Sequence, residues 1–103
     1  MNVQLKKGSL DLCVLALLCE QDMYGYELAD RISEAVRISE GTIYPLLKRI
    51  HGDGYVTTYL RESQEGPPRK YYSATREGRA EKERLLKEWD EFVSGMKKIL
   101  GDR

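Results

Sequence analysis

The sequence predicts an α+β fold that is mostly α-helical: a winged helix-turn-helix followed by one long C-terminal helix. Residues 39–52 carry apolar side chains at i, i+3, i+4 and i+7, which places them on one helical face. These positions are Ile43, Leu46, Leu47 and Ile50. Two strand-like runs, residues 55–60 and 69–74, flank a turn-like segment at 63–68. A heptad pattern then occupies residues 85–99.

The composition fits one small domain. The chain has 103 residues, of which 41% are hydrophobic, so it can build one modest core. We expect residues 1–74 to form the winged helix-turn-helix and residues 75–103 the terminal helix. The net charge is zero, which argues weakly against a nucleic-acid role, but residues 37–75 hold six Lys or Arg and four Asp or Glu. This modest excess indicates specific, salt-sensitive binding to a polyanion.

The first helix is expected over residues 10–19, which are apolar nearly all round, with Ser9 as its N-cap. Lys6 and Lys7 precede this run, so the segment loosely resembles a secretion signal. Asp11 interrupts the apolar stretch. Cleavage of the whole segment would also delete the most apolar helix of the domain. No apolar run is long enough to cross a membrane. We therefore expect a cytoplasmic protein.

Metal and catalytic chemistry find little support in the sequence. Cys13 and Cys19 lie more than about 100° apart around the first helix, so they cannot bond to each other, and neither has a ligand at metal-binding spacing. His51 is the only histidine, and we expect it at the end of the helix 39–52, where the helix dipole favours a cation. No nucleophile–base pair or Gly-rich phosphate loop is present. The sequence predicts no metal, no cofactor and no enzyme.

The second and third helices are expected to form the helix-turn-helix. The second runs from about residue 24 to 36, with Tyr24, Leu28 and Ile32 on one face. The third runs from about residue 39 to 52. Pro45 lacks the N–H that a helix interior requires, so we predict Thr42 as the effective N-cap, with Pro45 in the first turn.

The solvent side of the third helix is small, rigid, hydrogen-bonding and cationic, which suits a DNA major groove. The alternative is an ordinary solvated face. The predicted hairpin places Arg69 and Lys70 at its tip, where they can reach phosphates or the adjacent minor groove. Tyr71 and Tyr72 alternate along the return strand, so one of them should enter the core.

The last helix should begin at the cap residue Thr75 and run to about Leu100. Its apolar residues form a stripe about 140° wide, at about 100° per residue. They include Leu85, Trp89, Phe92, Met96 and Ile99, spaced 4, 3, 4 and 3. One edge can pack on the domain, and the rest needs a second chain. Homodimerisation follows, and the alternative is a helix that folds back onto its own domain.

Four motifs, in order, resemble the PadR family of bacterial transcription regulators. They are the segments 24–28, 40–49 and 66–72 and the pair Thr75 and Gly78. The short tail is similar to the small subfamily of these proteins. The resemblance implies a winged-helix dimer that binds a pseudo-palindromic double-stranded DNA operator, represses transcription, and dissociates when a small effector binds. Known effectors of the family include phenolic acids and planar hydrophobic drugs.

The resemblance also implies roles for individual residues. The expected DNA-binding residues are Thr42, Tyr44, Pro45, Lys48, Arg49, Arg69, Lys70 and Tyr71. The expected dimer and effector residues are Leu85, Trp89, Phe92, Val93 and Met96. Trp89 matches a residue that stacks on planar ligands at the dimer centre in drug-sensing relatives, and the alternative is a packed seam without a cavity. The alternative function is a winged-helix protein-interaction module that does not bind DNA.

Overall fold

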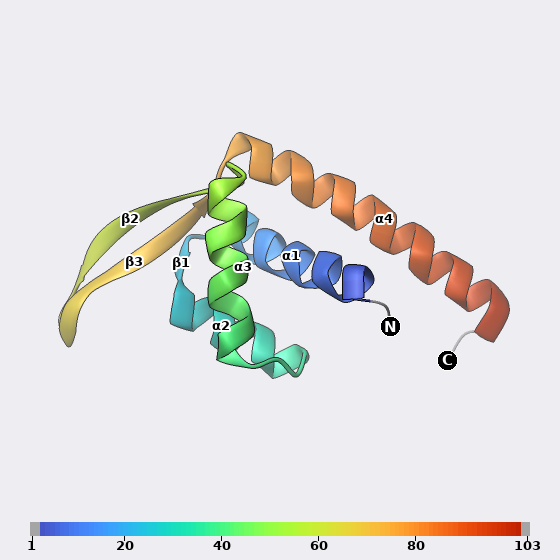
Figure 1. Cartoon of the computed structure of the whole chain (residues 1–103), viewed down its shortest axis with the longest axis horizontal. Helices are drawn as coiled ribbons and strands as arrows, with labels where there is room; N and C mark the ends of the chain where they lie inside the picture. Colours follow the sequence, from blue (N-terminus) through green and yellow to red (C-terminus); the bar gives the residue numbers. More distant parts are fainter. Residues whose placement is uncertain (1–2, 102–103) are drawn as a thin grey trace.

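A computed structural model describes residues 3–101 and confirms a mostly helical winged-helix fold. The helices are α1 (Val3–Glu20), α2 (Gly25–Ala35), α3 (Glu40–Gly52) and α4 (Arg76–Leu100). The strands are β1 (Met23–Tyr24), β2 (Val56–Ser63) and β3 (Gly66–Ala74). The hairpin of β2 and β3, here called the wing, projects on one side of the molecule, and α4 runs out on the other (Figure 1). No helix in the range 3–101 is long and apolar enough to cross a membrane.

One apolar core joins all four helices to the base of the sheet. The four apolar residues of α3 are buried, and three of them, Ile43, Leu47 and Ile50, have no exposed surface. They pack with residues of α1, α2, the sheet and α4. Those residues are Leu10, Val14, Leu15, Leu18, Met23, Leu28, Ala29, Ile32, Val56, Tyr72 and Leu85. The prediction of one buried α3 face is therefore confirmed.

The sheet is antiparallel, in the order β1-β3-β2. Strand β1 was not predicted from the sequence, and its two residues pair with Tyr71 and Tyr72 of β3. The wing is also longer than predicted, because β2 continues to Ser63 and β3 begins at Gly66. The expectation that residues 63–68 form only a turn is wrong. Pro67 and Pro68 lie opposite a single β2 residue, at an irregularity in the strand register. The N–H groups that prolines lack are not needed there for hydrogen bonds between the strands.

Two predicted helix starts are wrong. Helix α1 begins at Val3, so Ser9 lies inside it and is not its N-cap. Helix α3 begins at Glu40 with Ser39 as N-cap, so Thr42 is not the cap and Pro45 lies inside the helix. The helix tolerates Pro45 because the carbonyl left without its N–H belongs to Gly41, which is exposed in the first turn and open to solvent.

The predicted cap of α4 is confirmed, and it also fixes the helix to the loop before β2. The Thr75 hydroxyl accepts a hydrogen bond from Gly78 N at 3.0 Å and donates one to the Gly54 carbonyl at 2.7 Å. The Thr75 backbone N–H donates to the Tyr55 carbonyl at 3.0 Å. Gly78 is buried against this loop, where only a glycine allows such a close approach. The direction in which α4 leaves the domain is therefore set by the hydrogen bonds of Thr75 and by the close approach of Gly78 to Tyr55.

Replacing Gly78 with Ala is expected to lower the free energy of unfolding by about 2 kcal/mol or more. The added Cβ would lie 2.0 Å from the Tyr55 carbonyl oxygen, so the helix must shift. Gly8→Ala is the matched control, because nothing lies within 4 Å of a Cβ at that helical position. The free energy of unfolding of the control should rise by roughly 0.5–1 kcal/mol, because alanine favours a helix more than glycine does. Urea unfolding measures both, and an unchanged midpoint for Gly78→Ala would contradict the predicted clash.

Candidate nucleic-acid interface

The solvent side of α3 presents the predicted residues at the surface. Thr42, Tyr44, Pro45 and Lys48 are all exposed, opposite the buried apolar face. Tyr44 is 46% exposed, although one edge of its ring lies against Gly25, where a Cβ would come within 2.9 Å of Tyr44 Cε1. The tyrosine therefore packs on the start of α2 and still presents much of its surface to solvent. A contact between Tyr44 and DNA stays a prediction.

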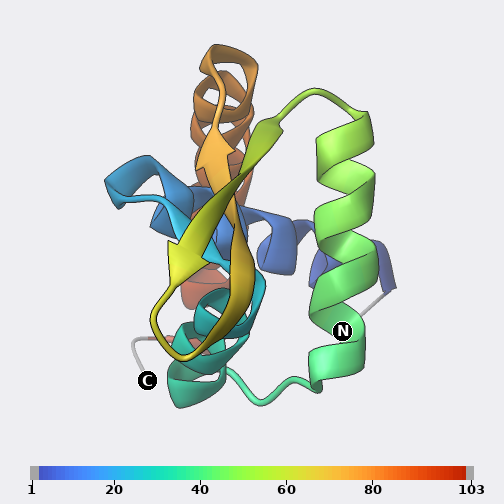
Figure 2. The ribbon, with the colours of Figure 1, turned by 90° about the vertical axis from the view of Figure 1, so that its left-hand side faces the viewer.

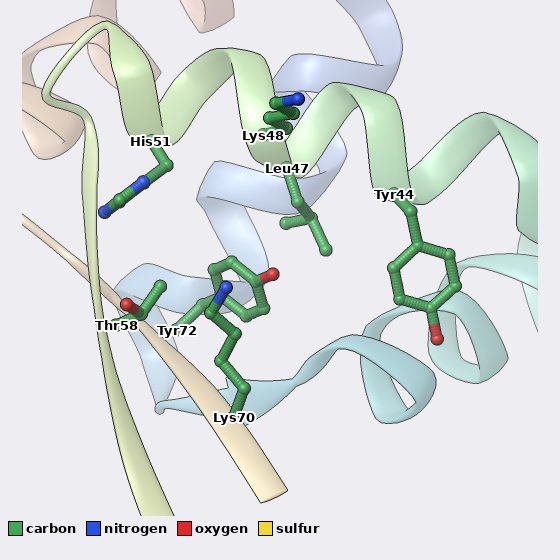
Figure 3. Close-up of a pocket in the computed structure, with 7 residues that line it drawn as sticks. All are labelled: Tyr44, Leu47, Lys48, His51, Thr58, Lys70 and Tyr72. Carbon is green, nitrogen blue, oxygen red and sulfur yellow. The ribbon is translucent and has the colours of Figure 1, made fainter.

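A groove separates α3 from the wing, with a volume of about 400 Å³ (Figure 3). Its lining residues are Tyr44, Leu47, Lys48, His51, Thr58, Lys70 and Tyr72. Lys48 stands on α3 and Lys70 on β3, so cations line both walls. Among the described side chains, neither ammonium group has an ion-pair partner. This α3–wing groove is a cationic channel between two elements, with polar side chains on both.

A second hollow of about 370 Å³ adjoins the groove and shares Tyr44, Lys70 and Tyr72 with it. It adds Arg69 from β3 and Tyr24 from β1. The cationic surface therefore continues past Tyr44 towards the start of α2. Burial raises the pKa of the Tyr72 hydroxyl above its ordinary value, so this side chain adds no negative charge to the cationic surface at neutral pH.

The wing corrects one prediction about its cations. Arg69 and Lys70 lie within β3 and not at the tip, which is formed by residues 64–65. Arg69 pairs in register with Arg61, and Lys70 pairs with Leu60, so the two cations point to opposite faces of the hairpin. Tyr72 is buried and Tyr71 is half-buried, which confirms that only one of these tyrosines enters the core. Figure 2 looks onto the hairpin, with α3 alongside it.

The sequence did not single out His51 as a residue of the groove, or Arg61 as a cation of the wing that stands opposite Arg69. His51 lies in the last turn of α3 and lines the groove with Thr58. The helical spacing of three between Lys48 and His51 could have placed both on one face. Arg61 could have been found only from the strand register, which depends on the length of the turn.

Arg49 is committed to an intramolecular ion pair with Asp11. Its two terminal nitrogens donate to the two carboxylate oxygens of Asp11 at 2.7 and 3.0 Å. The hydrogen bond to Asp11 raises the pKa of Arg49 above its usual range. This bidentate geometry joins α3 to α1 and holds the guanidinium close to the protein surface. A phosphate contact by Arg49 stays a prediction, and the pair favours a role in orienting α3.

The stripe on α4 is divided between the chain's own core and solvent. Leu85 packs in the core, in agreement with the expectation that one edge of the stripe packs on the domain, and its part in a dimer stays a prediction. Trp89 and Val93 are half-buried, whereas Phe92 is 37% and Met96 is 40% exposed. The rings of Trp89 and Phe92 lie 6.1 Å apart at 41°. Beyond them, Ile99 is 83% and Leu100 is 51% exposed, which leaves the end of α4 uncovered in the single chain.

Cys13 and Cys19 are both free and half-buried, and burial raises the pKa of the Cys13 thiol. Among the side chains that the structure describes, no three His, Cys, Asp or Glu gather as a metal site would require. The side chains of Lys6 and Lys7, which precede the apolar run of α1, lie outside those that the structure describes.

The helix-turn-helix, the wing and the cationic groove between them define a winged-helix protein of the kind that recognises nucleic acid. The model of the transcriptional regulator PadR-like family matches residues 14–84, and the chain belongs to this family. It is therefore a transcriptional regulator. Regulators of this family bind DNA and typically dimerise.

Individual relatives agree with this assignment. The chain is 31% identical over 96 residues to a transcriptional regulator of Mycobacterium tuberculosis, covering 89% of each protein. A Streptococcus transcriptional regulator is 36% identical, with a TM-score of 0.85 over 95% of this chain and 98% of that one. A PadR-like transcriptional regulator of Bacillus cereus is 32% identical, with a TM-score of 0.84 over 97% and 99% of the two chains.

The Asp11–Arg49 pair should contribute a measurable coupling to stability. Urea unfolding of Asp11→Ala, Arg49→Ala and the double variant is expected to give a coupling free energy of about 1 kcal/mol. The bidentate geometry favours this value over that of a simple surface pair. Effects that add without coupling would show that Arg49 does not act through Asp11.

Proposed function

We propose that the chain is a sequence-specific DNA-binding transcriptional regulator, a repressor that a small-molecule effector releases from its operator. The observation that supports DNA binding best is the α3–wing groove, whose two lysines have no acidic partner among the described side chains. In this proposal α3 enters the major groove. Thr42, Tyr44 and Pro45 then face the base edges or sugars, and Lys48 contacts a phosphate.

The wing supplies the second set of contacts. Lys70 faces the same groove as Lys48, so both can bind phosphates of one duplex. Arg69 lies on the other face of β3 and also lines the adjoining hollow. Tyr71 packs between Tyr24 and Tyr59, with ring centroids 5.5 and 5.7 Å away. Its role in DNA binding is therefore to hold the wing and Tyr24, the ring beneath Arg69, in place.

The proposed regulator is a homodimer joined through α4. The apolar residues of α4 that are exposed in the single chain are Phe92, Met96, Ile99 and Leu100. A contiguous exposed apolar surface of this kind is typical of a protein–protein interface. A second α4 packed on this surface would bury it and bring two copies of α3 to one face. Their half-sites would then lie on the order of 34 Å apart on a pseudo-palindromic operator. Residues 75–103 serve as the dimerisation helix and residues 1–74 as the DNA-binding region.

The effector in this proposal is a planar aromatic or hydrophobic molecule that stacks on Trp89 near the two-fold axis. Trp89 is half-buried beside Phe92 and Val93, so two facing copies can form a flat aromatic slot. A bound effector would change the spacing of the two wings and so weaken DNA binding. The proposed protein acts in the cytoplasm, without enzymatic activity or a cofactor.

Replacing Lys48 or Lys70 with Ala is expected to weaken binding to a genomic fragment that the purified protein retains, by about tenfold for each change, because each removes a phosphate contact. The slope of log affinity against log salt should also become shallower by about 1. Lys87→Ala removes the same charge from the exposed side of α4 and should change neither quantity.

Fluorescence anisotropy over a salt series measures all three variants. If both groove variants bind as tightly as the wild-type chain, the proposed interface is wrong. If the wild-type chain dimerises but retains no DNA at low salt, a winged-helix protein-interaction module is the better description.

Trp89 is the only tryptophan, so its fluorescence reports directly on the proposed effector site. Ferulic acid and the planar dye proflavine, titrated without DNA, represent the two effector classes. At least one should quench Trp89 at micromolar concentration and lower the affinity for the retained fragment. Calorimetry should show binding lost in Trp89→Ala and kept in Cys19→Ala. A ligand that binds Trp89→Ala as well as the wild-type chain would exclude stacking on this residue.

A further inference from the structure

The face of the wing that points away from the α3–wing groove carries a second pair of cations. Arg61 of β2 and Arg69 of β3 stand directly opposite each other in the strand register, so both side chains lie on this face. Tyr59 and Tyr71 form the next opposed pair on the same face, and Tyr24 of β1 pairs with Tyr71. We call these five residues the outer wing face.

Opposed like charges normally destabilise a sheet, so their arrangement here needs a compensating interaction. Each guanidinium lies over an aromatic ring: Arg61 is 5.3 Å from the centroid of Tyr71, and Arg69 is 4.6 Å from that of Tyr24. Neither arginine forms an ion pair with a described side chain. Asp22, which lies close to Tyr59, accepts a hydrogen bond from the Tyr59 hydroxyl at 2.6 Å and forms no ion pair with either arginine. The two charges are therefore held in place without being neutralised.

The hydrogen-bonding groups of both guanidinium groups are available to an anion. The rings contact Arg61 and Arg69 without a hydrogen bond, and no described residue accepts a hydrogen bond or forms an ion pair with either side chain, so the five N–H groups of each remain free. Two such forks on neighbouring strands match the oxygens of a phosphate, which bind arginine in bidentate fashion. The tyrosines restrict the arginine side chains in advance, so less conformational entropy is lost when an anion binds.

We propose that Arg61 and Arg69 together bind a backbone phosphate of DNA on the outer wing face, as a contact separate from the α3–wing groove. The inference rests on the proposed DNA-binding function and adds Arg61 to the interface. A DNA strand is the favoured occupant because the two surfaces are continuous: Arg69 also lines the hollow that contains Tyr44 and Lys70. A duplex bound to α3 would therefore also lie against the part of β3 that carries Arg69.

The test compares Arg61→Ala, Arg61→Lys and the control Lys87→Ala on the retained genomic fragment over a salt series. Arg61→Ala should bind about fivefold to tenfold more weakly, with a salt slope shallower by about 1. Arg61→Lys should keep the wild-type slope and recover only part of the affinity, because an ammonium group cannot form the bidentate fork. Lys87→Ala should match the wild-type chain in both.

Phosphate ethylation interference locates the contact on the DNA. One ethylated position should weaken the wild-type chain and Lys70→Ala but have no effect on Arg61→Ala. If Arg61→Ala matches the wild-type chain in affinity and slope while Lys70→Ala is weakened, the outer contact is refuted and the groove stands. If Lys48→Ala, Lys70→Ala and Arg61→Ala all bind normally, the proposed function fails together with this inference. Thermal unfolding of each variant separates these results from a loss of fold.

Discussion

The burial of one face of α3 is the constraint on which the rest of the molecule depends. Ile43, Leu47 and Ile50 have no exposed surface, and burial of such side chains contributes roughly 1.5–3 kcal/mol each. Together these contributions are comparable with the whole stability of a small domain, about 5–15 kcal/mol. The helix therefore cannot rotate about its axis without unfolding. The orientation of its opposite face, which carries Tyr44 and Lys48, is therefore fixed in the single chain.

Two polar contacts transmit this fixed orientation to the parts that flank α3. Asp11 and Arg49 join the helix to α1 through two hydrogen bonds. Thr75 and the buried Gly78 join the start of α4 to the loop between α3 and β2. The exposed stripe on α4 is thus held at a set angle to the exposed side of α3. A change at the α4 stripe has a short mechanical route to α3 and the wing, which is what the proposed release by an effector requires.

Most of the helical fold could be predicted from the sequence, because periodic apolar residues and the Thr75 cap are local signals. The buried face of α3 and the alternation of Tyr71 and Tyr72 followed from spacing alone. The strand β1 could not be predicted, since two residues become a strand only by pairing with β3. The prolines of β3 misled the prediction because a register irregularity removes the need for their N–H groups.

The candidate site was only partly predictable, because some of its contacts join residues that are far apart in the sequence. The α3 residues lie on one helix and share a face by their spacing, so sequence identifies them. The Asp11–Arg49 pair spans 38 positions, and the Arg61–Arg69 pair depends on the exact hairpin register. Contacts of this kind arise only when the chain has folded, and they distinguish cations that are paired within the protein from cations that are free to bind an anion.

Hydroxyl-radical footprinting on a genomic fragment retained by the purified protein tests the central proposal most directly. Two copies of α3 held by paired α4 helices should protect two patches related by approximate two-fold symmetry. Their centres should lie on the order of 34 Å apart, with each patch extended on one side by the wing. A single patch protected by one chain, or two patches at a spacing that varies between fragments, would contradict a dimer that presents both helices to one duplex.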